Sequence, residues 1–393
     1  MNISLSQRVA RIKPSPTLAV TAKAAELKAQ GIDVLSLGAG EPDFDTPAHI
    51  KEAAHQAIRD GFTKYTAVGG TASLKAAIAA KMKRDNALDY RPNQILVSNG
   101  GKQSCFNLCQ ALLSPGDESV IPAPYWVSYP DMVLLSDGKP VFIPTTVEAR
   151  FKITAEQLER AITPRTKLFW INSPSNPSGM AYTRAELAAL GEVLRRHPQV
   201  LIATDDMYEK ILWAKEPFAD IVNVCPDLYE RTVVIHAVSK TYSMTGWRIG
   251  WACGPAKLIT AMADIQSQST SNPNSIAQVA AEAALNGDQS CVAEMCKAFK
   301  ARHDKFVAGL NSVPGIRCAP ADGTFYAFPD CTGAMQKLGC ADDLALTDLL
   351  LQKARVAAVP GSAFGAPGCL RMSFATSDQV LDGSVERLRA LLA

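Results

Sequence analysis

Two cations eight residues apart, Lys240 and Arg248, are the side chains of this sequence best suited to covalent chemistry. Lys240 follows the apolar run 232–235, which is typical of a buried strand. A lysine just past such a strand lies partly out of water, where the ammonium form is disfavoured, and its free amine could form a Schiff base. Arg248, with glycines two residues away on either side, could hold a phosphate through its planar fork of donors. Alternatively, both are solvated loop cations.

The stretch 239–250, Ser-Lys-Thr-Tyr-Ser-Met-Thr-Gly-Trp-Arg-Ile-Gly, resembles the cofactor-lysine signature of class I pyridoxal-phosphate aminotransferases. These enzymes have pyridoxal-phosphate fold type I. The resemblance implies that pyridoxal 5'-phosphate is the cofactor and that Lys240 holds it as a Schiff base. It also implies that Ser239 and Arg248 bind the cofactor.

Polar residues that end a second apolar run, 201–204, give the resemblance independent support. Asp205 could keep a pyridine nitrogen protonated and so make the ring a better electron sink. An N-cap role is the alternative. The family places its aspartate at Asp205, and its tyrosine that donates to the cofactor's phenolic oxygen at Tyr208. Asn176, in the stretch 172–179, matches the family asparagine that contacts the same oxygen and the substrate.

A Gly-Gly turn and an indole are further candidate cofactor contacts. Gly100 and Gly101 precede a predicted helix, whose first backbone amides could bind a phosphate. Trp126 lies in a proline-rich loop and could stack on a flat ring and contact the substrate. Each also has a local explanation, a common turn and ordinary packing respectively.

Arginine and lysine residues in other stretches are candidates for substrate carboxylates. Arg371, on the apolar segment 370–375, would be costly to bury without an anion, which is either an internal carboxylate or a substrate α-carboxylate. The resemblance assigns it the α-carboxylate, and assigns a substrate contact to Gly40 in Gly-Ala-Gly-Glu-Pro-Asp-Phe-Asp.

The bacterial aspartate aminotransferase subgroup, which this chain matches most closely, uses a second cation for the distal carboxylate. Lys102 occupies that position and also adjoins the cofactor, and Ser15 and Thr17 supply the assisting hydroxyls. Lys102 could instead be a helix-start cation, although the helix dipole disfavours that. Tyr65 matches the tyrosine that reaches the partner's cofactor phosphate, which implies a homodimer with shared active sites. Packing is the alternative for Tyr65.

The elements that must position these residues alternate between short apolar runs and helices. Predicted strands are 95–98, 119–121, 141–143, 167–171, 200–204, 232–238 and 249–253, and helices between them include 104–113 and 184–196. Such alternation predicts an α/β fold with a mostly parallel sheet covered on both faces. Ligands collect at the carboxyl ends of the strands in sheets of this kind, and the candidate residues follow strands there.

The length of 393 residues predicts two domains. We expect residues 1–45 to form an amino-terminal arm and part of a small domain, 46–285 a large cofactor-binding domain with a seven-stranded sheet, and 286–393 the rest of a small α/β domain. Further predicted helices are 21–30, 47–60, 73–85, 275–284, 290–310, 344–354 and 381–392. Further strands are 34–37, 323–328, 356–359 and 370–375.

Composition excludes several classes of protein. With 47% hydrophobic and 20% charged residues and a net charge of +2, the chain has no nucleic-acid footprint. No apolar run approaches the roughly 20 residues of a membrane helix. The first 13 residues lack a secretory signal, so a cytoplasmic location is expected. The ten cysteines lack metal-site spacing and are expected to be buried thiols, with no metal site.

The resemblance implies ping-pong transamination of L-aspartate with 2-oxoglutarate, giving oxaloacetate and L-glutamate. Alternatives are an aromatic or prephenate aminotransferase, with Lys13 contacting prephenate's extra carboxylate, and a pyridoxal-phosphate lyase that cleaves carbon–sulfur bonds. A transcriptional sensor is disfavoured, because the sequence begins directly with the arm. Three departures from the family pattern are Ala237 in place of a phosphate-binding serine, Asp206 in place of glutamate, and Pro16 between the two arm hydroxyls.

Overall fold

The computed structural model describes residues 3–12, 14 and 16–393, with the backbone alone for 16–18 and 21. Its central feature is a seven-stranded sheet in the order β2-β8-β7-β6-β5-β3-β4. The strands are β2 Ile95–Ser98, β3 Glu118–Pro122, β4 Lys139–Ile143, β5 Thr166–Asn172, β6 Leu201–Asp205, β7 Thr232–Ala237 and β8 Gly250–Cys253. Only β8 runs antiparallel to its neighbours β2 and β7. The predicted mostly parallel, seven-stranded α/β sheet is confirmed.

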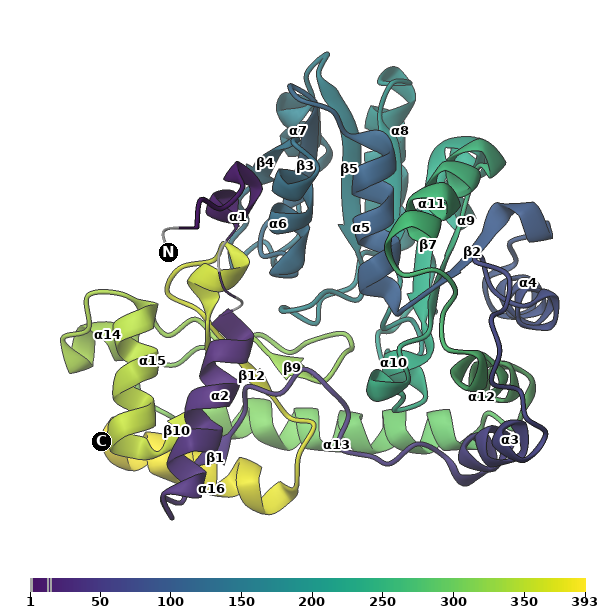
Figure 1. Cartoon of the computed structure of the whole chain (residues 1–393). Coiled ribbons are helices and arrows are strands. Elements are labelled where there is room, and N and C mark those ends of the chain that lie inside the picture. Colours follow the sequence, from purple (N-terminus) through teal and green to yellow (C-terminus); the bar gives the residue numbers. More distant parts are fainter. Residues whose placement is uncertain (1–2, 13, 15) are drawn as a thin grey trace.

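Helices cover both faces of this sheet, which is why its strands are apolar throughout. One face packs against α3 Ala48–Arg59, α4 Ala72–Asn86, α7 Ala155–Ala161, α8 Arg184–Arg196, α9 Ile221–Val224 and α12 Ser275–Asn286. The other packs against α5 Gly101–Leu112, α6 Ser128–Leu135 and α11 Ala256–Ser269, which lie in front of the sheet in Figure 1. The sequence did not predict α6, α7, α9 or α11.

A second set of elements has its own apolar core below this sheet (Figure 1). Its antiparallel sheet has the order β11-β12-β9, with β9 Tyr326–Ala327, β11 Val359–Pro360 and β12 Leu370–Ser373. Its helices are α13 Ser290–Asn311, α14 Thr332–Leu338, α15 Asp343–Leu349 and α16 Asp378–Leu391. A turn of π-helix, 350–354, continues the predicted helix 344–354 beyond α15.

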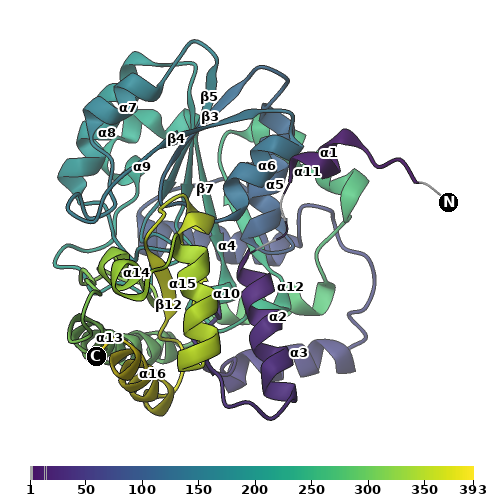
Figure 2. The ribbon, with the colours of Figure 1, turned by 90° about the vertical axis from the view of Figure 1, so that its left-hand side faces the viewer.

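The amino-terminal segment joins this second set. β1 Leu35–Ser36 pairs in parallel with β10 Val356–Ala357, and α2 Pro16–Ala29 lies beside α15 in both views (Figures 1 and 2). Both ends of the chain therefore contribute to one smaller unit. The boundaries at 45/46 and 285/286 stay a prediction.

The amino-terminal arm is more helical than its prolines suggest. The sequence predicts a helix from residue 21, whereas α2 begins at Pro16. That boundary was wrong because proline's fixed φ suits the first turn of a helix. A short helix that was not predicted, α1 Gln7–Arg11, lies against α6, with Arg8 and Arg11 both paired to Asp137. Over the residues described, no helix has the length and apolar character needed to span a membrane.

Candidate active site

A cavity of about 440 Å³ lies where the carboxyl ends of β6 and β7 face the smaller unit. Seventeen residues line it, and eleven of them are predicted site residues: Gly40, Gly101, Lys102, Trp126, Asn176, Asp205, Tyr208, Ser239, Lys240, Arg248 and Arg371. The loop before α3, the start of α5 and strands of both sheets thus supply one site. This is the place where parallel α/β sheets bind ligands.

Lys240 lies in the single helical turn α10, Val238–Thr241, that directly follows β7. Its Nζ donates a hydrogen bond of 2.6 Å to the carbonyl oxygen of Gly40. Burial lowers the pKa of Lys240 to about 8, assisted by the positive charges of Arg371 and Arg248 and opposed by Glu41. A substantial share of this amine is therefore neutral near pH 8 and able to act as a nucleophile or base.

Asp205, the last residue of β6, is buried at the floor of the cavity. Burial raises the pKa of its carboxyl to about 6, although the hydroxyl of Tyr129 donates to Oδ2 at 2.5 Å and favours the charged form. Asn172 donates from Nδ2 to the Asp205 carbonyl oxygen at 2.8 Å. The carboxylate is therefore held in one orientation and lacks a cationic partner within 4.0 Å among the described residues.

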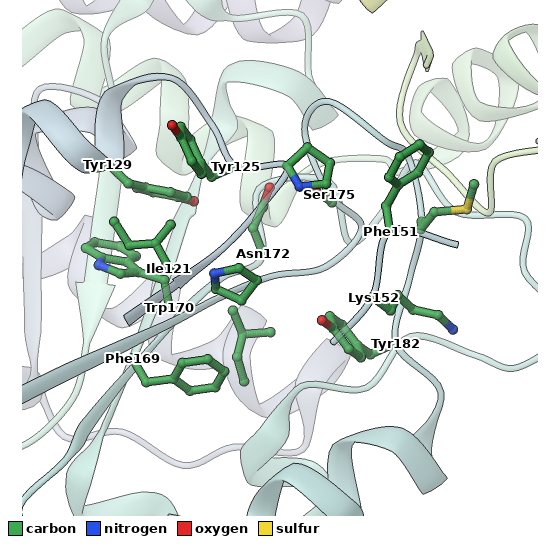
Figure 3. Close-up of a pocket in the computed structure, with 14 residues that line it drawn as sticks. Ile121, Tyr125, Tyr129, Phe151, Lys152, Phe169, Trp170, Asn172, Ser175 and Tyr182 are labelled. Atoms are coloured by element: carbon green, nitrogen blue, oxygen red, sulfur yellow. The ribbon is translucent and has the colours of Figure 1, made fainter. Parts of the chain in front are cut away.

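Tyr129 is itself fixed by aromatic packing. Its ring stacks on Trp170 with centroids 4.4 Å apart, and Trp126 meets its edge at 5.3 Å. Figure 3 shows Tyr129 and Trp170 one above the other, with Asn172 nearby. A small cavity of about 30 Å³ adjoins these rings, which is room for one or two water molecules and not for a substrate.

The start of α5 and Arg248 form the opposite end of the main cavity. Gly100 has φ +82°, and a Cβ there would lie 2.4 Å from Nη2 of Arg248, so the guanidinium needs a glycine beneath it. Arg248 donates to two backbone carbonyls, those of Thr245 at 2.9 Å and Asn99 at 3.1 Å. Its charge has no carboxylate partner among the described residues, so an anion could bind here at a helix amino terminus.

Arg371 on β12 is only 2% exposed, yet no carboxylate of the described chain lies within 4.0 Å of it. It donates to Oδ1 of Asn176 at 3.1 Å and to the Gly38 carbonyl at 3.0 Å, and its Nε has no partner. Its guanidinium also lies over the ring of Tyr326, 4.5 Å from the centroid. The sequence left an internal salt bridge as the alternative role of Arg371, and the described residues contain no such bridge.

Lys102 and Trp126 border the same cavity. The ammonium of Lys102 lies 5.1 Å from the indole centroid, a cation–π contact. Burial, together with the charge of Arg248, lowers the pKa of Lys102. Tyr208 forms a hydrogen bond of 3.1 Å between its hydroxyl and that of Tyr326. Besides Lys240, three cations of the described chain therefore line the cavity, Lys102, Arg248 and Arg371.

Five residues singled out in the sequence are not placed in the cavity, and one of them is Gly100, which lies beneath Arg248 without lining it. Tyr65 is 92% exposed and does not line it. Ser15 and Lys13 lie outside the described residues, and the side chain of Thr17 is not described.

Other residues of the site were missed by sequence reasoning, chiefly Tyr129, Tyr326, Met207 and Thr245. Tyr129 had a usable signal, since it follows Trp126 by three residues, although it belongs to α6 and not to the loop that was singled out. Tyr326 reaches the cavity from another sheet, and no local pattern marks it. The described chain contains no cluster of residues able to hold a metal ion.

Comparison with known proteins identifies the family. The model of aminotransferase class I and II matches residues 32–388. The chain belongs to this family. It is 62% identical to the aspartate/prephenate aminotransferase of Nitrosomonas europaea, over all of both chains. It is 49% identical to the aspartate aminotransferase of Bacillus sp. strain YM-2, over 98% of each.

Solved structures agree with this assignment. The aspartate aminotransferase from Thermus thermophilus with maleate aligns over 100% of both chains, with a TM-score of 0.94 and 41% identity. The aminotransferase described here is thus a class I enzyme close to the bacterial aspartate aminotransferases, and its fold is consistent with fold type I.

Class I aminotransferases imply pyridoxal 5'-phosphate, and the donor set fits that group. The buried amine of Lys240 suits its aldehyde, and the buried carboxylate of Asp205, which has no cationic partner among the described residues, suits a protonated ring nitrogen. Arg248 and the start of α5 suit its phosphate. Ala237 is buried and provides no hydroxyl there.

Proposed function

We propose that this aminotransferase moves the amino group of L-aspartate to 2-oxoglutarate, giving oxaloacetate and L-glutamate. The observation that carries the proposal is Arg371, a buried cation that faces the cavity without a carboxylate partner in the described chain. A second cation, Lys102, lines the same cavity. Two separated cations suit a dicarboxylate. Support also comes from the solved structure of the Thermus thermophilus aspartate aminotransferase with maleate, because maleate is a four-carbon dicarboxylate.

In this proposal, Arg371 holds the substrate α-carboxylate through its two terminal nitrogens. Asn176 and Gly38 already orient that guanidinium, so binding costs little rearrangement. Pyridoxal 5'-phosphate, when bound, would supply an electron sink for the substrate α-carbon. The neutral amine of Lys240 would take up the substrate α-proton and release it again.

The remaining residues keep the cofactor in place. Asp205, oriented by Tyr129, would keep the ring nitrogen protonated, while Tyr208 and Asn176 would contact the phenolic oxygen. Arg248, Ser239, Gly100 and Gly101 would hold the phosphate. The backbone carbonyl of Gly40 accepts a hydrogen bond from the amine of Lys240 at 2.6 Å and so orients that amine.

Lys102 binds the distal carboxylate, assisted by Ser15 and Thr17 of the arm. The test is a single-turnover measurement of the cofactor absorbance band after mixing with L-aspartate or L-alanine. We expect rapid bleaching with aspartate in the wild type, weakened about tenfold in Lys102→Ala for aspartate alone. Lys353→Ala, at an exposed lysine far from the cavity, is the control. Equal loss with both amino acids would contradict a distal-carboxylate role.

Prephenate is a second candidate amino acceptor, because the Nitrosomonas europaea and Cereibacter sphaeroides relatives are named aspartate/prephenate aminotransferases. The test is recovery of the aldehyde form of the cofactor when the aminated enzyme meets prephenate or 2-oxoglutarate. Recovery with both supports dual use. Recovery with 2-oxoglutarate alone restricts the enzyme to the first reaction.

We also propose a homodimer in which Tyr65 serves the partner's site. Its 92% exposure in the single chain, away from the chain's own cavity, supports this. Subunit mixing tests the idea: Tyr65→Ala and Lys240→Ala chains, each poorly active alone, should regain activity in hybrids. The hybrid then contains one site with both residues intact. Absence of recovery would place Tyr65 in its own chain's site or outside catalysis.

A further inference from the structure

The loop that connects Lys240 to Arg248 has a backbone conformation that needs outside support. It leaves α10 after Thr241, passes through a short 3-10 helix, Thr245–Trp247, and reaches Arg248. Ser243 and Arg248 have φ values of +52° and +57°, which residues other than glycine adopt rarely. Residues in this left-handed region persist only where the surrounding structure holds them there. The contacts that hold the loop therefore decide where the guanidinium of Arg248 lies.

One side chain from outside the loop, that of Thr46, contacts it at two points. The Oγ1 atom of Thr46 donates to the carbonyl oxygen of Ser243 at 2.7 Å and accepts from Nε1 of Trp247 at 3.0 Å. Thr46 is only 7% exposed, and hydrogen bonds are stronger in such low-dielectric surroundings. Trp247 directly precedes Arg248. A single hydroxyl therefore ties together the two sides of the turn just before the arginine.

The same segment of the chain contacts the loop a second time. The hydroxyl of Thr245 donates to Oε2 of Glu41 at 2.7 Å. The carbonyl of Thr245 is one of the two that accept from Arg248. The Glu41–Thr245 bond lies at an exposed position, where water can replace it at little cost. Of the two contacts, the buried one made by Thr46 should therefore matter more.

Segment 41–46 can support the loop because it is itself anchored to α13. Asp43 forms an ion pair with Arg302 at 2.7 Å. The rings of Phe44 and Phe299 meet edge to face, with centroids 5.3 Å apart. Figure 1 shows this connection running beside α13 on its way to α3. The sequence assigned a role only to Gly40 in this part of the chain, so the residues after it were left without one.

We propose that Thr46 is a positioning residue for the cofactor phosphate, because it holds the loop 243–247 in the conformation that directs Arg248 to the cavity. This inference rests on the proposed role of Arg248 as the phosphate contact. Thr46 does not line the cavity, and neither do Ser243 and Trp247, through which it acts. Lys240 lies before the loop, in the turn that directly follows β7. Loss of the Thr46 hydroxyl should therefore affect the phosphate site and spare the amine.

Two ligands separate the phosphate site from the rest of the cavity. Pyridoxal 5'-phosphate and pyridoxal share the ring and the aldehyde, and only the first has a phosphate. In Thr46→Val, we expect the dissociation constant of pyridoxal 5'-phosphate to rise about tenfold, because both hydrogen bonds to the loop are lost. That of pyridoxal should change little. Absorbance titration of the full-length protein after removal of the cofactor measures both. Equal weakening of the two ligands would overturn the proposal.

Thr46→Ser is the matched variant. Valine keeps the shape of threonine without its hydroxyl, whereas serine keeps the hydroxyl without the methyl group. Thr46→Ser should retain the wild-type ratio of the two dissociation constants. A role in packing alone predicts the reverse, a harmless valine and a harmful serine, and that result would contradict the proposal. If Thr46→Val does not fold, Thr46→Ser decides: a retained ratio supports the hydroxyl, and a lowered preference for the phosphate form overturns it.

Thr260→Val controls for the loss of a threonine hydroxyl elsewhere. Thr260 is exposed on α11, and its hydroxyl donates to the carbonyl oxygen of Ala256 at 2.9 Å. It does not line the cavity. This variant should bind both ligands as the wild type does. A loss of phosphate preference here as large as in Thr46→Val would contradict a specific role of Thr46.

Arg248→Gln distinguishes a failure of this inference from a failure of the proposed phosphate contact. It should weaken pyridoxal 5'-phosphate and spare pyridoxal, as Thr46→Val does, but more strongly. An unchanged ratio in Arg248→Gln would overturn the phosphate role of Arg248, and the positioning role of Thr46 with it. A lowered preference in Arg248→Gln together with an unchanged one in Thr46→Val would overturn the positioning role alone.

Discussion

Arg371 and Lys81 are both buried cations, 2% and 3% exposed, but the protein treats them differently. Lys81 forms an ion pair with Glu209 and a hydrogen bond with Asn86. Arg371 contacts carbonyl and amide oxygens and aromatic rings, with no carboxylate within reach in the described chain. Burying a charge is expensive unless it is paired. The chain pairs Lys81 internally and leaves Arg371 available for a substrate anion.

The comparison separates stability from function. Removing an internal partner leaves a buried charge alone in every molecule, so it weakens the fold. Arg371 already costs free energy in the free protein, because its charge is buried without an anion. Removing it should therefore leave the fold intact and weaken substrate binding instead. The largest expected effects come from this contrast.

The strongest test is Arg371→Met. We expect kcat/KM for L-aspartate to fall by about three orders of magnitude, equivalent to about 4 kcal/mol, because the α-carboxylate loses its buried partner. The free energy of unfolding should stay the same or rise. Steady-state kinetics and denaturant titration measure the two quantities, with Lys81→Met as the matched variant. Equal destabilisation by both substitutions would contradict the inferred difference between Arg371 and Lys81.

Glu209→Gln tests the internally paired cation. It leaves Lys81 buried without an anion, so we expect the free energy of unfolding to fall by about 3 kcal/mol. The double variant Lys81→Met/Glu209→Leu should recover most of this loss, because no charge remains buried. Urea unfolding checks both. A double variant as unstable as Glu209→Gln would show that packing, not charge, sets the effect.

Glu209 also gives a stability prediction against pH. Although burial acts in the opposite direction, the charge of Lys81 lowers the pKa of Glu209 to about 2. The resulting stabilisation is present above about pH 4.3 and is lost as the pH falls toward 2. Glu209→Gln should therefore differ from the wild type most near neutral pH and least near pH 2. Thermal melting across this range measures the difference.

Tyr129→Phe removes the hydroxyl that holds Asp205. Burial already raises the pKa of Asp205 to about 6, and loss of this donor should raise it further. The acid limb of kcat/KM should move to higher pH, with activity at neutral pH about tenfold lower. A merely structural role would lower activity equally at all pH values. The packing partners of the ring, Trp126 and Trp170, remain in place.

The smallest effect concerns the amine of Lys240. The rate of cofactor attachment to the apoenzyme should rise with pH and level off above about 8, where the amine is neutral. Burial is the main cause of this low pKa, and the charge of Arg371 adds to it. In Arg371→Met the midpoint should therefore move to higher pH. Absorbance after mixing with pyridoxal 5'-phosphate measures the reaction. An unchanged midpoint would show that the charge of Arg371 does not lower the pKa of Lys240.

Local patterns predicted the main sheet well. All seven strands lie within two residues of the predicted ends, because a strand buried on both faces reads as a short, continuous apolar run. Helices α6, α7, α9 and α11 were missed. In α6 a proline precedes the unbroken apolar run 132–135, so no stripe at helical spacing marks it. The start of α2 was hidden by prolines, whose helix-initiating role depends on the residues after them.

The sequence by itself determined the kinds of residue available, their order and the strand ends at which they lie. Lys240, Asp205 and Arg248 could be proposed because the apolar runs and glycines next to them in the chain indicate strand ends and turns. Only the tertiary structure decided which distant groups meet. Tyr129 is 76 residues from Asp205, and Arg371 lies 195 residues from Asn176. Whether a buried charge has a partner depends on such contacts, which no local pattern encodes.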